Sequence, residues 1–120
     1  MTKVLIIESD EGARYLYQIA LRFQKFDVIT ANNAAEGLVE LKNSKPDLVL
    51  LDVMVPDLDK VGFLGELQKS ECAPLPLIIL TDLRDGAAQK EAAIFGACEY
   101  LNKKESLGEI ISSVRKAIDK

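Results

Sequence analysis

Five short apolar runs recur along the chain, separated by stretches with helical spacing. The runs lie at residues 4–7, 28–31, 48–51, 77–80 and 98–101. Three of them are almost uninterrupted apolar sequence, which is typical of strands that are buried on both faces of a parallel sheet. We therefore predict five strands near residues 3–7, 27–31, 47–51, 76–80 and 98–101.

The stretches between these runs carry apolar residues at the spacing of a helix. One stripe consists of Ala13, Leu16, Tyr17, Ala20 and Phe23, and another of Leu107, Ile110, Ile111, Val114 and Ile118. Ser106 followed by Glu109 is a capping box, and Asn33 followed by Glu36 is a weaker version of the same signal. These patterns predict helices near residues 10–24, 33–43, 60–70, 86–95 and 106–119.

Alternating strands and helices predict an α/β fold. Parallel strands joined by right-handed crossover helices form an open, doubly wound sheet with helices on both faces. The length of 120 residues suits a single domain spanning residues 1–120. Ligands of such sheets bind beyond the carboxyl ends of the strands, so the residues there are the candidates for function.

Composition and charge exclude several classes of protein. With 15 basic and 19 acidic residues, the net charge is −4, and the longest basic run is Lys103-Lys104, which argues against direct nucleic-acid binding. No stretch has the length of a membrane span or the layout of a secretory signal, so we expect a cytoplasmic protein. The chain has no His, which excludes His-based catalysis and His-ligated zinc. Cys72 and Cys98 are interpreted as reduced, small apolar residues.

Polar residues follow four of the five predicted strands. They are Glu8, Ser9 and Asp10 after the first, Asp52 after the third, Thr81 and Asp82 after the fourth, and Asn102, Lys103 and Lys104 after the fifth. Carboxylates held together attract a hard cation such as Mg²⁺, whereas a Lys and a Thr hydroxyl suit phosphoryl oxygens. The combination predicts phosphoryl transfer to a carboxylate.

Over nearly its whole length the chain resembles the receiver domain of two-component response regulators. The matching pieces are Val4-Leu5-Ile6-Ile7-Glu8, Arg14, Asp52-Val53-Met54-Val55-Pro56-Asp57, Ile78-Ile79-Leu80-Thr81, Gly96-Ala97 and Tyr100-Leu101-Asn102-Lys103. Each piece is weak alone, and their order and spacing make the combination specific. The resemblance implies a flavodoxin-like fold with five parallel strands in the order 2-1-3-4-5.

The resemblance also implies roles for individual residues. Asp52 would accept a phosphoryl group from a histidine kinase or a phosphotransfer protein, while Thr81 and Lys103 would contact the phosphoryl oxygens. Tyr100 would be the aromatic switch residue that responds to Thr81. Mg²⁺ would be held by Glu8, Asp52 and the backbone carbonyl of Met54, with Asp10 as a further candidate acting through a water. The output surface would be the fourth helix, fifth strand and fifth helix, which would bind a downstream protein.

Four positions depart from the usual pattern of this family. Ser9 stands where a second carboxylate normally reaches the metal, which predicts weaker Mg²⁺ binding; Ser9 as the N-cap of the first helix is an equally good interpretation. Asp82 follows Thr81 where a small residue is usual. Lys104 replaces a proline after Lys103, and Lys60 replaces a glycine.

Two functions of different classes follow. The first is a phosphoacceptor signalling domain that is not an enzyme in the usual sense, although it would catalyse its own phosphorylation and dephosphorylation. The alternative is a pseudo-receiver, a phosphorylation-independent interaction module, which Ser9, Asp82 and Lys104 favour. A flavin carrier is a distant third, because only Gly12 follows the first strand where a glycine-rich phosphate loop would lie. The sequence does not distinguish a stand-alone domain from part of a longer chain.

Overall fold

A parallel sheet forms the centre of the computed structural model, which describes residues 2–59, 62–63, 65–66, 75–81, 99–102 and 106–119. Within these ranges five strands follow the order β2-β1-β3-β4-β5, in agreement with the order expected from the sequence. They are β1 (Lys3–Ile7), β2 (Asp27–Ala31), β3 (Leu48–Asp52), β4 (Leu77–Thr81) and β5 (Glu99–Asn102).

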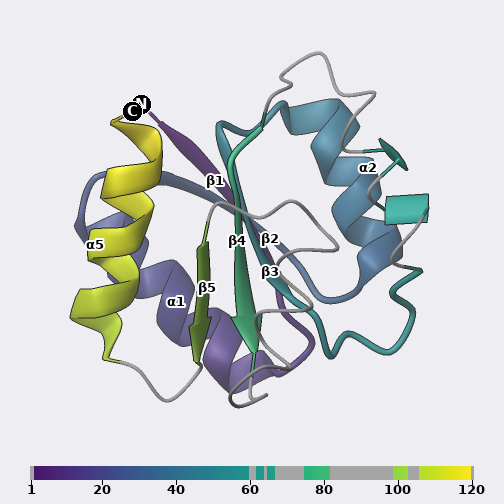
Figure 1. Ribbon diagram of the computed structural model, residues 1–120, viewed down its shortest axis with the longest axis horizontal. Helices are drawn as coiled ribbons and strands as arrows, with labels where there is room; N and C mark the ends of the chain where they lie inside the picture. The colour runs from purple at the N-terminus through teal and green to yellow at the C-terminus, as the bar shows by residue number, and fades with distance from the viewer. Residues whose placement is uncertain are drawn as a thin grey trace.

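Helices cover both faces of this sheet (Figure 1). The helices α1 (Glu11–Phe23) and α5 (Leu107–Ile118) pack on one face, and α2 (Ala34–Ser44) packs on the other. Side chains alternate between the faces along each strand, so the sheet divides the core in two. Leu5, Ile7 and Val49 lie in the core under α2, whereas Ile6 and Leu50 lie in the core under α1 and α5.

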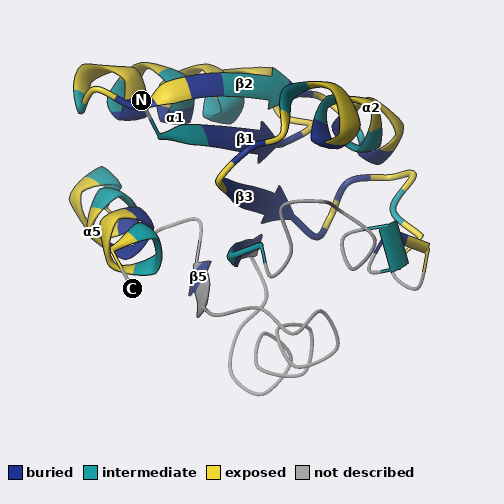
Figure 2. Cartoon of the chain, turned by 90° about the horizontal axis from the view of Figure 1, so that it is seen from above, coloured by how far each residue is buried: buried dark blue, intermediate teal, exposed yellow. Residues whose placement is uncertain are grey.

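Strand β3 is the best-buried element of the sheet, and all five of its residues are buried. It pairs with β1 on one side and with β4 on the other. Figure 2 shows it in the colour of buried residues between these neighbours, while the exposed residues follow the outer sides of the helices. This position explains why its sequence is apolar without alternation.

Three side chains cap the helices that the structure describes. The Asn33 side chain accepts a hydrogen bond from the N–H of Glu36, and the Ser106 hydroxyl accepts one from the N–H of Glu109, as the capping patterns predict. The interpretation of Ser9 as the cap of α1 is wrong. Asp10 takes that position because its extended backbone places Oδ2 2.8 Å from the N–H of Ala13.

The apolar stripe predicted for α1 is only partly buried in the structure. Tyr17 is buried, as is Leu21, which the stripe did not include. Leu16 and Phe23 are exposed. Helical spacing therefore identifies the helix but not the face that the sheet covers. The stripe of α5 does face the core, with Ile110 and Val114 buried and Leu107, Ile111 and Ile118 packed beside them.

Two strands end one residue later than the apolar pattern predicts. Asp52 and Thr81 are the last residues of β3 and β4, and the ladder continues through the Val53 N–H, which donates to the carbonyl oxygen of Leu80. Of the helix expected at residues 60–70, positions 62–63 and 65–66 have helical backbone and Phe63 is buried. The remaining positions and the helix expected at 86–95 lie outside the described residues.

Candidate functional site

The register of the sheet brings Glu8 and Asp52 next to each other at the carboxyl ends of β1 and β3. Ile7 and Leu51 are direct partners in the parallel ladder, and Glu8 and Asp52 are the residues that follow them. Both are almost completely buried, with exposed fractions of 0% for Glu8 and 1% for Asp52. Two buried carboxyl groups at neighbouring strand ends form a cluster of oxygen atoms that favours the binding of a cation.

Backbone and side-chain contacts fix the turn after β1. The N–H of Glu8 donates to the carbonyl oxygen of Ala31 at 3.0 Å, which extends the pairing with β2 by one residue. The Glu8 carboxylate accepts from the N–H of Asp10 at 3.2 Å, and the Arg14 guanidinium donates to the Glu8 carbonyl oxygen at 2.9 Å. Arg14, which the sequence offers only as a family motif, therefore holds Glu8 in position.

Ser9 and Asp10 are exposed, unlike Glu8. The carboxylate of Asp10 is engaged at the N-terminus of α1 through its contact with Ala13. A contact of Asp10 with a metal through a water stays a prediction. Glu8 is thus the only carboxylate of the β1 end that lies buried at the sheet.

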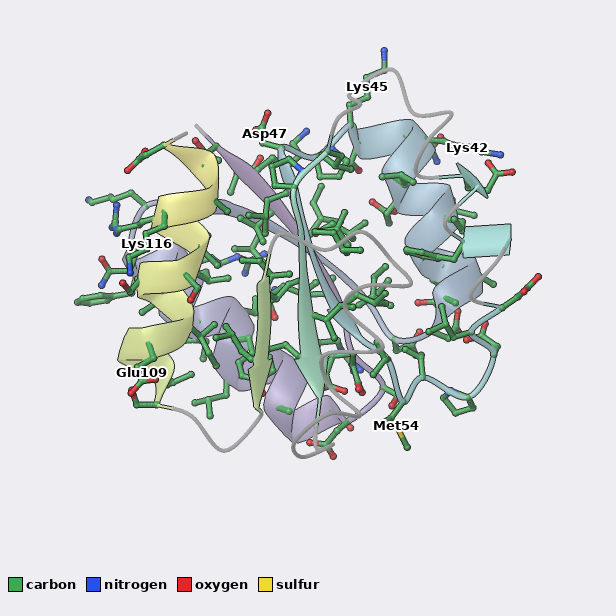
Figure 3. The ribbon with its side chains drawn as sticks, in the orientation of Figure 1. Lys42, Lys45, Asp47, Met54, Glu109 and Lys116 are labelled. Carbon is green, nitrogen blue, oxygen red and sulfur yellow. The ribbon has the colours of Figure 1, made fainter. Side chains whose placement is uncertain are left out.

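A tight turn follows the acceptor candidate Asp52. Its Oδ1 accepts a hydrogen bond from the N–H of Met54 at 2.9 Å, and its carbonyl oxygen accepts one from the N–H of Val55 at 3.3 Å. The first contact fixes the orientation of the carboxylate. The Met54 side chain is exposed, and Figure 3 shows it at the edge of the molecule towards which β4 and β5 run.

Asp57 is a functional candidate that the sequence analysis quoted but gave no role. Its Oδ1 accepts from the N–H of Ala34 at 2.7 Å, and its Oδ2 accepts from the N–H of Ala35 at 3.0 Å. The bond from Ala34 is the main reason why the pKa of Asp57 lies below its ordinary value of 3.8. The loop after Asp52 is therefore tied to the start of α2. The only sequence signal for Asp57 is its acidic side chain next to Pro56. Its partners could not be read from the sequence, because they lie 22 and 23 positions away.

The structure places the backbone of the other predicted site residues only in part. Thr81 pairs with Asn102 at the ends of β4 and β5, and Ile79 pairs with Tyr100. Because Asp52 pairs with Leu80, Thr81 follows directly beside the acceptor strand. Lys103, Asp82, Lys104 and Lys60 lie outside the described residues, so the predictions made for them stay predictions.

The donor set at the strand ends fits Mg²⁺. This ion prefers oxygen ligands and is commonly held by one or two carboxylates, with waters and substrate oxygens completing its shell. Glu8, Asp52 and the carbonyl oxygen of Met54 would provide two carboxylates and one neutral oxygen. Among the residues that the structure describes, no cluster of three or more His, Cys, Asp or Glu side chains offers an alternative metal centre.

Comparison with protein families shows which family the chain belongs to. Residues 4–115 match the response regulator receiver domain. The chain belongs to this family. Receiver domains are signalling domains of two-component systems, and they generally bind Mg²⁺ at the site of phosphorylation. None of the described helices of this receiver domain is long and apolar enough to cross a membrane.

Two curated relatives illustrate the similarity in sequence. The KDP operon transcriptional regulatory protein KdpE of Escherichia coli (strain K12) is 34% identical over 119 residues, which cover 98% of this chain and 52% of that protein. The response regulator MprA of Mycobacterium sp. (strain KMS) is 32% identical over 114 residues, covering 94% of this chain and 49% of that protein. The chain thus spans about half the length of these relatives.

Solved structures show the same fold. The receiver domain of the Francisella response regulator 1452 has a TM-score of 0.87 at 26% identity, covering 99% of this chain and 98% of that one. A two-component response regulator from Clostridium difficile has a TM-score of 0.89 at 21% identity, covering 100% of this chain and 98% of that one. The receiver domain therefore has the CheY-like fold, an α/β fold with a parallel sheet.

Proposed function

We propose that this receiver domain accepts a phosphoryl group on Asp52 from a histidine kinase or a phosphotransfer protein. The observation that carries the proposal is the buried Asp52 carboxylate at the end of β3, oriented by the N–H of Met54 and lying beside Glu8. A carboxylate oxygen of Asp52 would attack the phosphorus of a phosphohistidine. The new P–O bond would form as the P–N bond breaks, and the imidazole would leave with the electron pair.

The remaining residues take the roles that the family assigns to their positions. Thr81 and Lys103 contact the phosphoryl oxygens, and Tyr100 responds to Thr81 as the switch residue. The new charge then alters the protein-binding surface formed by residues 86–95, β5 and α5. Residues 1–120 act as one receiver domain in this scheme.

Mg²⁺ would be held by Glu8, Asp52 and the Met54 carbonyl, and when bound it would neutralise charge on the phosphoryl group. Ser9 contributes a neutral hydroxyl where the family normally has a second carboxylate. Asp10, the next acid in the chain, is engaged in capping α1. We therefore propose that the affinity for Mg²⁺ is lower than is usual for receiver domains.

The intact mass of the protein after incubation with acetyl phosphate and Mg²⁺ tests the proposal. We expect the mass of one phosphoryl group on the parent protein and none on the matched variant Asp52→Asn, which keeps the size of the side chain but removes the nucleophile. Equal labelling of both proteins would identify another acceptor and contradict the assignment of Asp52.

The second candidate is an interaction module that does not need phosphorylation. The exposed Ser9 favours this candidate. Ser9 adds no third carboxylate to Glu8 and Asp52, which are the buried acids at the described end of the sheet. Absence of labelling at high Mg²⁺, both with acetyl phosphate and with a phosphorylated phosphotransfer protein, would support this candidate over the first.

A further inference from the structure

Helix α1 carries a second apolar face that points away from the sheet. Tyr15, Leu16, Ile19 and Phe23 have exposed fractions of 62%, 51%, 47% and 81%. The buried side chains Tyr17 and Leu21 lie on the other side of the helix. An isolated exposed apolar residue is ordinary, but four large ones on one helix form a continuous surface that water solvates poorly.

The outward residues follow the spacing of a coiled-coil seam. Gly12, Leu16, Ile19 and Phe23 are separated by 4, 3 and 4 positions, which is the alternation of the two core positions in a heptad. The packing of α1 on the sheet and beside α5 uses its other face, so it does not require this second seam. The pattern fits a facing helix that runs along α1.

We propose that α1 is a self-association surface, on which the α1 helix of a second copy of this chain packs in antiparallel orientation. In a symmetric pair, each residue of one copy meets the same partner residue in the other. A two-fold axis between Leu16 and Ile19 places Leu16 of each copy opposite Ile19 of the other. The same symmetry places each Phe23 opposite the Gly12 of the facing helix.

The size of these residues makes the antiparallel pair self-complementary. Phe23 is the largest and most exposed member of the seam, and Gly12, which it would meet, has no side chain. A Cβ atom built on Gly12 would meet nothing closer than Asp10 Oδ2 at 3.7 Å, so the surface there is open. A bulky ring would therefore fill a gap in the facing helix, as a knob fills a hole.

Charge favours the same orientation. The first turn of α1 contains the acidic Glu11, and the last turn contains the basic Arg22. An antiparallel pair brings the acidic end of each helix beside the basic end of the other, and it also opposes the two helix dipoles. A parallel pair would place like charges together at both ends. A second copy of this chain is thus the occupant whose shape and charge match the seam.

Sedimentation velocity of the full chain over a wide range of concentration tests the proposal. A seam of one short helix predicts a weak dimer that forms only at high concentration. We expect Ile19→Lys and Phe23→Lys each to weaken dimerisation by at least tenfold, because each buries a charge in the seam. The matched control is Val39→Lys on α2, which also replaces an exposed apolar residue and should leave the dimer unchanged. Circular dichroism verifies that all three variants are folded.

Disulfide cross-linking tests the orientation. In chains with Cys72 and Cys98 replaced by Ser, a mixture of Gly12→Cys and Phe23→Cys proteins should cross-link to a mixed dimer. The Gly12→Cys protein alone should not, because antiparallel helices separate the two copies of position 12 by about 16 Å along the axis. A disulfide requires Cα atoms within about 7 Å.

Two results would overturn the proposal. One is a chain that stays monomeric at every concentration. If the lysine variants of such a chain also lose binding to a helical phosphotransfer protein, the seam belongs to that protein instead. The other is cross-linking of Gly12→Cys with itself, which would indicate a parallel pair. None of these results depends on phosphorylation of Asp52, so the proposed function is tested separately.

Discussion

Helices α1 and α2 begin in the same way, yet the structure holds them differently. Each has a side-chain cap three residues upstream of the N–H that it binds, Asp10 for α1 and Asn33 for α2. The N-terminus of α2 has a second anchor in Asp57, which comes from the loop after β3. The distant contact of α1 lies at its other end, where the Arg115 guanidinium of α5 donates to the side chain of the C-cap residue Gln24 at 2.8 Å.

This difference in anchoring distinguishes two helices that cover the same sheet. The cap of α1 joins residues of the same segment and stabilises that helix alone. The anchor of α2 joins it to the loop that carries Met54, the residue whose N–H orients Asp52. Helix α2 is therefore coupled through Asp57 to the loop that orients Asp52. Helix α1 is coupled through Arg14 to the Glu8 end of the site, and it also presents an apolar face to solvent.

The largest effect on stability is expected from the close packing of α2. A Cβ atom on Gly37 would overlap the buried Ile7 side chain, with Cγ1 at 2.9 Å, whereas one on Gly12 of α1 would meet no close neighbour. We expect Gly37→Ala to lower the free energy of unfolding by about 2 kcal/mol through overpacking. Gly12→Ala should leave it unchanged or raise it, because Ala favours helices. Urea denaturation measures both, and equal losses would contradict the difference in packing.

A change at Ser9 tests the α1 side of the site. We expect Ser9→Asp to tighten Mg²⁺ binding by about tenfold, because it adds a negative charge beside the buried Glu8 and Asp52. The neutral Ser9→Asn is the matched control and should bind as the parent does. Isothermal titration calorimetry measures the affinity. An unchanged affinity in Ser9→Asp would mean that Asp10 already supplies this charge.

The cap of α1 and the anchor of α2 can be compared directly by removing the carboxylate of each, Asp10 or Asp57. Asp57→Ala and Asp10→Ala should each lower the free energy of unfolding by about 1 kcal/mol, which is typical of a lost helix cap. Only Asp57→Ala should also slow phosphorylation of Asp52, because it releases the loop that contains Met54. Stopped-flow or mass-spectrometric rates with acetyl phosphate measure this effect. Similar rates in both variants would show that the anchor serves α2 alone.

The smallest expected effect is a dependence on pH. The pKa of Asp57 is lowered in the folded protein, chiefly by the hydrogen bond from Ala34, so the folded state binds this proton more weakly than the unfolded state. The stability that Asp57 contributes is therefore complete above its ordinary pKa of 3.8 and is lost as the pH falls through the lower folded value. The difference between the parent and Asp57→Ala should be full at pH 7 and should shrink in acid. A difference that persists at the lowest pH would contradict the role of the charge.

The sequence predicts those parts of the fold that local or periodic patterns determine. Runs such as Leu48–Leu51 identify strands because burial on both faces permits only apolar residues there. The caps of α2 and α5 are readable because each joins residues three positions apart. Glu8 and Asp52 could be placed together because parallel strands bring their carboxyl ends to the same edge.

The parts that the sequence could not predict depend on contacts between distant segments. The two apolar faces of α1 have the same helical period, so only the packing of Tyr17 and Leu21 on the sheet reveals which one is buried. Asp57 binds α2 across 23 positions of sequence, and no local pattern encodes that contact. Asp10 and Ser9 are both good capping residues, and backbone geometry alone selects Asp10.

The central position of β3 has a consequence for the motions of the protein. Its amides are buried and hydrogen-bonded on both sides, so hydrogen exchange at Val49 to Leu51 should require unfolding of the whole domain. The turn that follows, with Met54 exposed, should exchange through local openings that cost far less. Asp52 stands at the boundary between these two regimes. Its main chain belongs to the ladder of the core, while the N–H that orients its carboxylate belongs to the turn outside the ladder.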